Sequence, residues 1–209
     1  MAVASTDAGP HGRADCHAWH AQLAEVFVYE YLRRSLGEAT ITPASWVSTS
    51  RRLVFPDDDH KGDDRAGYDF TFVDHQNRLG GATERGPLTY YVEVKGQLSP
   101  TKKSIYLTDN EWRTCRLVHE RGPDEPPAVY VLVVVCLAPE PVRILYWLED
   151  PYHLMNQGLV NVRPDRLAVV VNVPPLHTRG VDPATGADVL VPFHGVAPLP
   201  RQAMMAFNA

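Results

Sequence analysis

The sequence lacks the long apolar segment that a membrane-spanning helix requires. No stretch of its 209 residues approaches the roughly 18 to 20 uninterrupted apolar positions of such a helix, and its N-terminal residues contain no apolar core of the signal-peptide kind. It has only three cysteines, Cys16, Cys115 and Cys136, an odd and widely spaced set that suits a reducing compartment better than a disulfide framework. We therefore expect a cytoplasmic protein that is not associated with a membrane, in which the cysteines are structural.

Several motifs of common enzyme classes are also absent. The chain has no Walker phosphate-binding loop, no dinucleotide-binding fingerprint and no nucleophile elbow. The group His11, Cys16, His17 and His20 superficially suggests zinc, but no second pair of ligands completes a tetrahedral set. The net charge of -5 argues against a generally basic surface for nucleic acid, yet five aspartates between residues 57 and 64 supply much of it. We expect that acidic stretch to be a solvated loop, so the net charge excludes little.

The composition, with 44% apolar and 22% charged residues, is typical of a globular protein, and the length suits one domain. Residues 1–15 are small and polar and predict a flexible N-terminal arm. Residues 16–173 contain the expected domain, which begins with a helix over residues 17–35. Residues 174–209 are rich in proline and glycine and predict an extension that wraps the domain or docks elsewhere.

Hydrophobic alternation predicts most of the remaining elements. Strands are expected near 45–55, at 67–74 and 88–95 as a hairpin with a long loop, and within 103–108. Thr108 and Glu111 form a capping-box pattern, so a second helix should start there and continue to about His119. Further strands are expected at 128–138, 142–150 and 166–173, and the first of these should be buried on both faces. Asp150-Pro151 should open a short helical turn after the second.

Glu93 and Lys95 stand two apart in a predicted strand, so their side chains share one face. Alone, such a pair is a common ion pair on an exposed sheet. The predicted hairpin, however, brings the carboxylate of Asp69 beside Glu93. Two carboxylates and a substrate phosphate suffice to hold Mg²⁺ or Mn²⁺, with the carbonyl of Val94 as a third ligand. Lys95 would then orient the attacking water or stabilise the transition state, which predicts a metal-dependent phosphodiesterase centre.

Glu25 lies on the first predicted helix without a cation one turn away. Its neighbours at that spacing include Ala21, Val28 and Tyr29. A carboxylate on a mainly apolar stripe is costly to bury unless a cation or a hydrogen-bond donor meets it. Glu25 is therefore either a structural or half-exposed carboxylate, or it faces a metal or Lys95.

These residues resemble the PD-(D/E)XK nuclease superfamily, in which an aspartate, a Glu-x-Lys triplet and a helix glutamate lie on an αβββαβ core. The succession of motifs is similar to the Protein NO VEIN C-terminal domain family over residues 17–173; it comprises Gly67-Tyr68-Asp69, Glu93-Val94-Lys95-Gly96, Leu107 to Trp112 and Asp150-Pro151. Two features depart from the superfamily pattern. Tyr68 replaces its proline, and the loop between Asp69 and Glu93 is long.

The resemblance implies an α/β, restriction-endonuclease-like fold with a mixed central sheet flanked by helices. It also implies a Mg²⁺- or Mn²⁺-dependent endonuclease that hydrolyses nucleic acid, with DNA preferred, in a defence or restriction-type system. Asp69, Glu93, Lys95 and Glu25 would be its catalytic residues, and an ATPase or helicase module would be a partner. Cutting both strands would favour a homodimer. The alternative is a module that retains the nuclease fold and binds nucleic acid or protein without cleaving.

A nuclease also needs positive surface for the phosphate backbone. The basic candidates are Lys102 and Lys103, followed by Arg51, Arg52, Arg113 and Arg116, and Gln97 is a further candidate contact. The alternatives are solvated loop lysines and an exposed glutamine at a strand end. Two interpretations are open for Asn110, Glu111 and Trp112. They would either line the nucleic-acid groove or, as we favour, form a helix cap and a packed indole.

Overall fold

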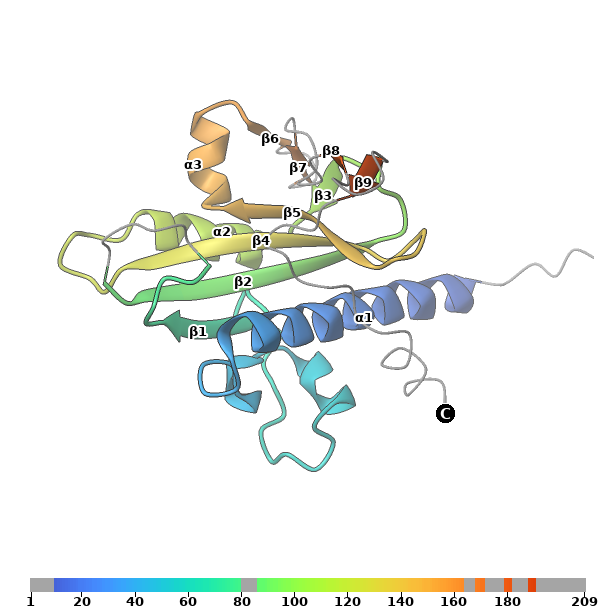
Figure 1. Ribbon diagram of the computed structural model, residues 1–209, viewed down its shortest axis with the longest axis horizontal. Helices are drawn as coiled ribbons and strands as arrows, with labels where there is room; N and C mark the ends of the chain where they lie inside the picture. The colour runs from blue at the N-terminus through green and yellow to red at the C-terminus, as the bar shows by residue number, and fades with distance from the viewer. Residues whose placement is uncertain (1–9, 80–85, 164–167, 172–178, 182–187, 191–209) are drawn as a thin grey trace, which may run out of the picture.

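A four-stranded mixed sheet forms the centre of the protein (Figure 1). The computed structural model describes residues 10–79, 86–163, 168–171, 179–181 and 188–190. The strands of the sheet, in spatial order, are β1 (Phe70–Asp74), β2 (Leu88–Gln97), β4 (Ala128–Cys136) and β5 (Arg143–Glu149). β2 and β4 are parallel, whereas the two outer pairs are antiparallel. The predicted hairpin and the predicted α/β class with a mixed central sheet are confirmed.

Helices and smaller sheets surround this centre. The helices are α1 (Pro10–Leu36), α2 (Asp109–His119) and α3 (Pro151–Asn156), with short 3₁₀ helices η1 (Pro43–Ser45) and η2 (Thr49–Leu53). A second sheet has the order β3 (Ser104–Tyr106), β7 (Ala168–Val171) and β6 (Val160–Arg163), and β8 (Arg179–Val181) pairs with β9 (Asp188–Leu190). The order α1, β1, β2, β3, α2, β4 matches the predicted αβββαβ succession, although β3 pairs with β7 and not with the central sheet. None of the helices in the described ranges has the length and apolar character to cross a membrane.

β4 is buried on both faces, as its continuous apolar sequence predicts. Val131, Val133 and Val135 pack in a core with α1, while Leu132 and Val134 pack in a second core on the opposite face. The α2 helix packs on that second face, nearer the start of β4. The two faces of the sheet are therefore covered by different helices.

Two predicted elements differ from the structure. The first helix begins at Pro10, so part of the segment expected as an arm is helical. The strand expected at 45–55 is wrong, because these residues form 3₁₀ turns and share only one isolated bridge with the sheet, between Trp46 and Phe70. The predicted domain boundaries stay predictions, since residues 1–9 and most of 174–209 lie outside the described ranges.

α1 lies against β2 (Figure 1), and Gly96 of the strand faces His20 and Ala24 of the helix. A Cβ atom at this position would lie 2.6 Å from the His20 carbonyl oxygen and 3.1 Å from the Ala24 Cβ. The first contact is closer than real Cβ atoms come to other atoms, the second is tighter than most, and the carbonyl belongs to the helix backbone. Glycine at this position thus allows α1 to lie directly on the strand that carries Glu93 and Lys95.

We expect Gly96→Ala to lower the free energy of unfolding by about 1–3 kcal/mol, because the added methyl group pushes α1 away from β2. Gly122→Ala is the matched control, since a Cβ there meets nothing within 4 Å. Urea denaturation of the two variants and the wild type measures the difference. Equal stability of the Gly96 and Gly122 variants would contradict the close packing.

Candidate active site

The candidate site lies along an edge of β2 that β1 does not cover. Pairing between the two strands begins at Phe70 and Val92, and the Asp69 N–H adds a hydrogen bond of 2.8 Å to the Val92 carbonyl. β2 continues beyond this point to Gln97. Side chains from both faces of the sheet can therefore meet at the exposed edge.

Asp69 takes the place of the missing strand partner. Its Oδ2 accepts a hydrogen bond of 2.8 Å from the Val94 N–H. A strand residue directs its N–H and its C=O to the same side, so the Val94 carbonyl also faces this edge. The geometry supports the prediction that the Asp69 carboxylate and the Val94 carbonyl belong to one site.

Residues of β4 and α2 contact the turn that precedes Asp69. The Tyr130 hydroxyl donates to the Gly67 carbonyl at 3.0 Å. Gly67 has a φ of +80°, and a Cβ there would lie 2.5 Å from the Thr114 Oγ1. Glycine is required because the backbone conformation is left-handed and the helix lies against it. The Gly-Tyr-Asp motif thus fixes the approach of Asp69 to β2.

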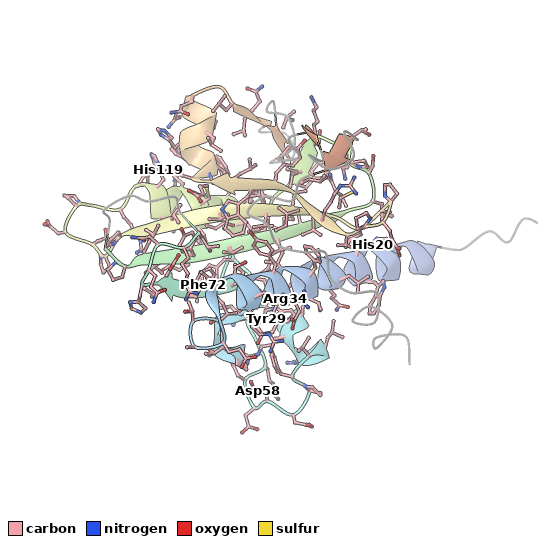
Figure 2. All side chains as sticks on the ribbon, viewed as in Figure 1. His20, Tyr29, Arg34, Asp58, Phe72 and His119 are labelled. Atoms are coloured by element: carbon pink, nitrogen blue, oxygen red, sulfur yellow. The ribbon has the colours of Figure 1, made fainter. Side chains whose placement is uncertain are left out.

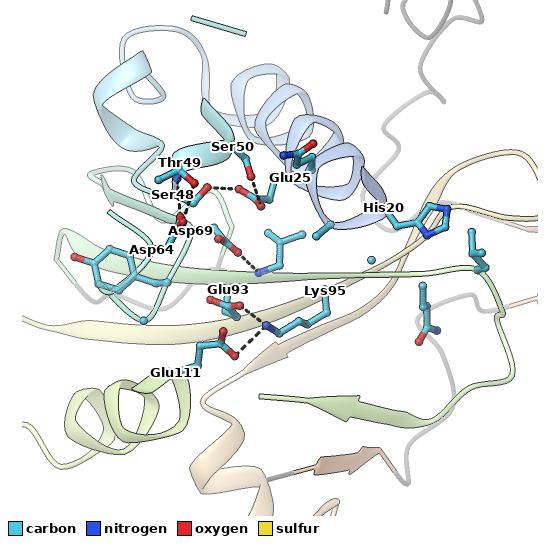
Figure 3. A pocket seen from close by; sticks show the side chains of 18 of the residues that line it. His20, Glu25, Ser48, Thr49, Ser50, Asp64, Asp69, Glu93, Lys95 and Glu111 are labelled. Atoms are coloured by element: carbon cyan, nitrogen blue, oxygen red, sulfur yellow. Dashed lines mark hydrogen bonds and ion pairs between the residues drawn. The ribbon is translucent and has the colours of Figure 1, made fainter. Parts of the chain in front are cut away.

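Lys95 is held between two carboxylates on the face of the sheet that α2 covers. Its Nζ lies 2.6 Å from the Glu93 Oε1 and 2.9 Å from the Glu111 Oε2 (Figure 3). Glu111 also accepts from the Thr108 N–H at 2.9 Å, which confirms the predicted capping box. The sequence favoured the cap over the alternative that Glu111 lines the groove, but Glu111 does both, and no sequence pattern indicated its contact with Lys95.

Glu25 reaches the edge from α1, on the other face of the sheet. Its Oε2 accepts from the Trp46 Nε1 at 3.0 Å and from the Ser48 hydroxyl, and its Oε1 accepts from the Ser50 hydroxyl at 2.8 Å. Glu25 is buried, and these donors, rather than Lys95, meet its carboxylate. The same hydroxyl groups explain why the segment turns away from a strand conformation.

The site holds more carboxyl groups than cations. Burial raises the pKa of Glu25, and burial together with the charges of Glu93 and Glu25 raises the pKa of Asp69 well above its usual range. Burial also raises the pKa of Glu93 to about 8, although Lys95 opposes this shift. Burial alone would lower the pKa of Lys95, but Glu93 and Glu111 raise it above its ordinary value. Additional positive charge would therefore stabilise the ionised carboxylates.

A cavity of about 580 Å³ connects these groups. Besides the residues already described, it is lined by Asp64, Gln97 and Lys102. The carboxylate of Asp64 accepts from the N–H and the hydroxyl of Thr49 at 2.8 and 2.7 Å. Asp64 belongs to the acidic stretch expected to be only a solvated loop, and nothing in that run of aspartates distinguishes it. The rest of the stretch projects away from the sheet, with Asp58 on this loop in Figure 2.

Two expectations about polar residues are corrected. Gln97 is 8% exposed, so the alternative of a solvated glutamine at a strand end is wrong. Arg51 is 1% exposed, pairs with Asp58 and donates to the Trp46 carbonyl at 3.1 Å. This arginine stabilises the loop from inside and offers no surface to nucleic acid. Lys102 lines the cavity, whereas Lys103 is exposed outside its lining.

The oxygen donors at this edge determine which metal ion the site could hold. Among the residues whose placement is described, no three His, Cys, Asp or Glu side chains are grouped so that they could hold a metal ion. The edge instead offers the carboxylates of Asp69 and Glu93 with the carbonyl of Val94. Such a set of hard oxygen donors fits Mg²⁺ or Mn²⁺, which keep several waters and share a substrate phosphate.

The chain was matched to a known protein family. The family model described as Protein NO VEIN, C-terminal matches residues 24–147. The matched range begins one residue before Glu25 and contains Asp69, Glu93, Lys95 and Glu111, so it includes the whole edge site. No curated protein and no solved structure matches the chain.

The raised pKa of Glu93 predicts how stability depends on pH. The carboxyl group has a pKa of about 8 in the folded protein and an ordinary value of 4.5. Between these values the folded state binds more protons than the unfolded state, so the free energy of unfolding falls as the pH rises through this window. Thermal denaturation in EDTA should show this fall, and Glu93→Gln should make it less steep. A wild-type curve no steeper than that of the variant would contradict the assignment.

Proposed function

The chain belongs to the Protein NO VEIN, C-terminal family, and on this basis we propose that it is a metal-dependent nuclease of the PD-(D/E)XK type. Its substrate would be nucleic acid, with DNA preferred, and the reaction would be hydrolysis of a phosphodiester bond. The observation that carries the proposal is Lys95, which lies between two carboxylates at an open sheet edge, one strand from Asp69. Figure 3 shows Asp69 between Glu25 and Glu93 in this arrangement.

Asp69, Glu93 and the Val94 carbonyl are the residues that would hold the metal ion. Mg²⁺ or Mn²⁺ bound there would supply Lewis-acid activation of the phosphate and of a water. Both carboxylates are buried, and the negative charge of Glu93 raises the pKa of Asp69. A divalent cation relieves this repulsion, which is the reason the donor set suits it.

Lys95 would act on the substrate as a cation. An ammonium group has three N–H donors, and Glu93 and Glu111 occupy two of them. The third is available to an oxygen of the substrate phosphate or to the attacking water. Because the two carboxylates raise its pKa, Lys95 remains protonated and stabilises negative charge that develops at phosphorus, rather than removing a proton from water.

Glu25 is a positioning residue in this proposal. It fixes Trp46, Ser48 and Ser50, and the Val47 N–H in this segment donates to the Asp69 carbonyl at 2.7 Å. Glu25 therefore acts on the backbone of Asp69 through the segment that it anchors. Its negative charge also adds to the field that attracts a cation to the edge.

Cleavage assays test the proposal directly. Purified protein is incubated with linear and supercoiled DNA and with RNA of the same sequence, in Mg²⁺, Mn²⁺ or EDTA. We expect cutting that needs the metal and that falls about 100-fold or more in both Lys95→Ala and Asp69→Asn. The first variant removes the cation at the phosphate, and the second removes a charged ligand of the metal ion. Lys61→Ala, at an exposed lysine outside the cavity, is the matched control for Lys95.

The controls distinguish a nuclease from a binding module. Activity that survives in Lys95→Ala would show that the cutting belongs to a different site or a contaminant. A folded wild-type protein that binds DNA and metal but never cuts would support the alternative, a non-cleaving module.

Replacing Glu111 separates its two contacts. Glutamine can still accept the capping hydrogen bond from Thr108, but it carries no charge to hold Lys95. Glu111→Gln should keep the melting temperature and lower the cleavage rate at saturating metal on the order of tenfold, about 1.4 kcal/mol in the barrier. Thr108→Ala should lower the melting temperature and keep the cleavage rate, since it weakens the cap and leaves the contact between Glu111 and Lys95. If both variants lost cleavage rate and melting temperature together, Glu111 would act only as a helix cap.

A further inference from the structure

The side chain of Gln97 is buried in the wall of the cavity. It is the last residue of β2 and is 8% exposed, yet its Nε2 has no hydrogen-bond partner within the described part of the chain. Its backbone carbonyl accepts from the Leu137 N–H at 2.8 Å, so the residue is firmly held. A buried donor left unpaired costs about 1–3 kcal/mol. Because the residue lines the cavity, an acceptor on a ligand would recover that cost.

The position of Gln97 relates it to the proposed reaction centre. Alternation along β2 places Gln97 on the same face as Glu93 and Lys95. At a rise of about 3.3 Å per residue, it lies roughly 7 Å beyond Lys95 along the strand. That distance is comparable with the separation of adjacent phosphates in a nucleic-acid strand. A strand whose scissile phosphate lies at Lys95 can therefore place its next phosphate at Gln97.

The charge of the cavity changes along the same line. The carboxylates gather around Asp69 and Lys95, whereas the lining beyond Lys95 consists of Gln97, Leu98, Ser99 and Lys102 with His20 opposite. Figure 3 shows His20 at the other end of the cavity from Asp64. The Nζ of Lys102 lies 5.5 Å from the Tyr106 ring centroid, a cation–π contact that keeps the ammonium near this end. This end attracts an anion without the help of a metal ion.

We propose that Gln97 and Lys102 form a second anion subsite, which binds the phosphate adjacent to the scissile one. This subsite rests on the proposed nuclease function and defines the substrate more closely. The cavity would take two consecutive phosphates of a strand that runs along β2. A polynucleotide therefore binds through both subsites, whereas a compound with a single phosphodiester uses only the reaction centre.

Two substrates distinguish the subsite from the reaction centre. Bis(p-nitrophenyl) phosphate has one phosphodiester and no neighbouring phosphate, and an oligothymidylate has both. Gln97→Met keeps the length of the side chain and removes the donor. We expect KM for the oligonucleotide to rise about tenfold with kcat nearly unchanged, because the lost contact is the same in the ground and transition states. Hydrolysis of bis(p-nitrophenyl) phosphate should stay at the wild-type rate.

Stability gives an independent reading of the same variant. Replacing an unpaired buried amide with an apolar group should leave the melting temperature unchanged or higher, so weaker binding cannot be attributed to unfolding. Gln76→Met, at an exposed glutamine outside the cavity, is the matched control. A Gln97→Met variant that loses activity equally on both substrates would overturn the subsite and make Gln97 a support for Lys95.

A binding assay separates failure of the subsite from failure of the proposed function. Fluorescence anisotropy with labelled oligothymidylate in EDTA measures affinity without cleavage. Weaker binding by Gln97→Met and Lys102→Gln, with a smaller salt dependence only for Lys102→Gln, is the expected result. Equal affinity of Gln97→Met and the wild type would overturn the subsite even where the wild type cuts DNA. A wild type that cuts neither substrate refutes the nuclease, and the anisotropy result then decides the anion subsite alone.

Discussion

The site depends on the point at which β1 and β2 separate. A strand edge without a neighbour leaves N–H and C=O groups unpaired, which is usually a liability. Here the Asp69 carboxylate accepts the Val94 N–H that a longer β1 would have bonded, so one side chain replaces a strand. The exchange leaves the Val94 carbonyl on an accessible edge beside two carboxylates. The same interruption that ends the hairpin ladder therefore assembles the oxygen donors.

Burying this much negative charge imposes a cost that the surrounding structure reduces only in part. Trp46, Ser48 and Ser50 give Glu25 three donors, and Lys95 is shared by Glu93 and Glu111. Asp69 accepts from the Val94 N–H, and burial together with the charges of Glu93 and Glu25 raises its pKa well above its usual range. Hydrogen bonds thus satisfy Glu25, whereas the buried charge at Asp69 and Glu93 is balanced only in part. Such local destabilisation is common where activity requires it.

The sequence predicted what depends on local periodicity and missed what depends on packing between elements. Alternation placed Glu93 and Lys95 on one face, and the capping-box pattern located the start of α2. That Glu111 also reaches Lys95 depends on how α2 packs against β4, which no local pattern encodes. Gln97 is buried although it ends β2, and the segment after Trp46 forms a turn whose hydroxyls bind Glu25. In each case the deciding partner lies more than twenty residues away or on a different element.

α2 connects the two halves of the site, and this has a mechanical consequence. Its first turn holds Lys95 through Glu111, while Asn110 donates to the Arg65 carbonyl at 2.7 Å and Thr114 lies against Gly67. Arg65 and Gly67 belong to the turn that leads into Asp69. A displacement of α2 would therefore move the lysine and the aspartate together, because one rigid helix contacts the supports of both. A packed helix of this length moves as one rigid body. The relative position of Lys95 and Asp69 therefore depends on how α2 packs against β4 as well as on β2.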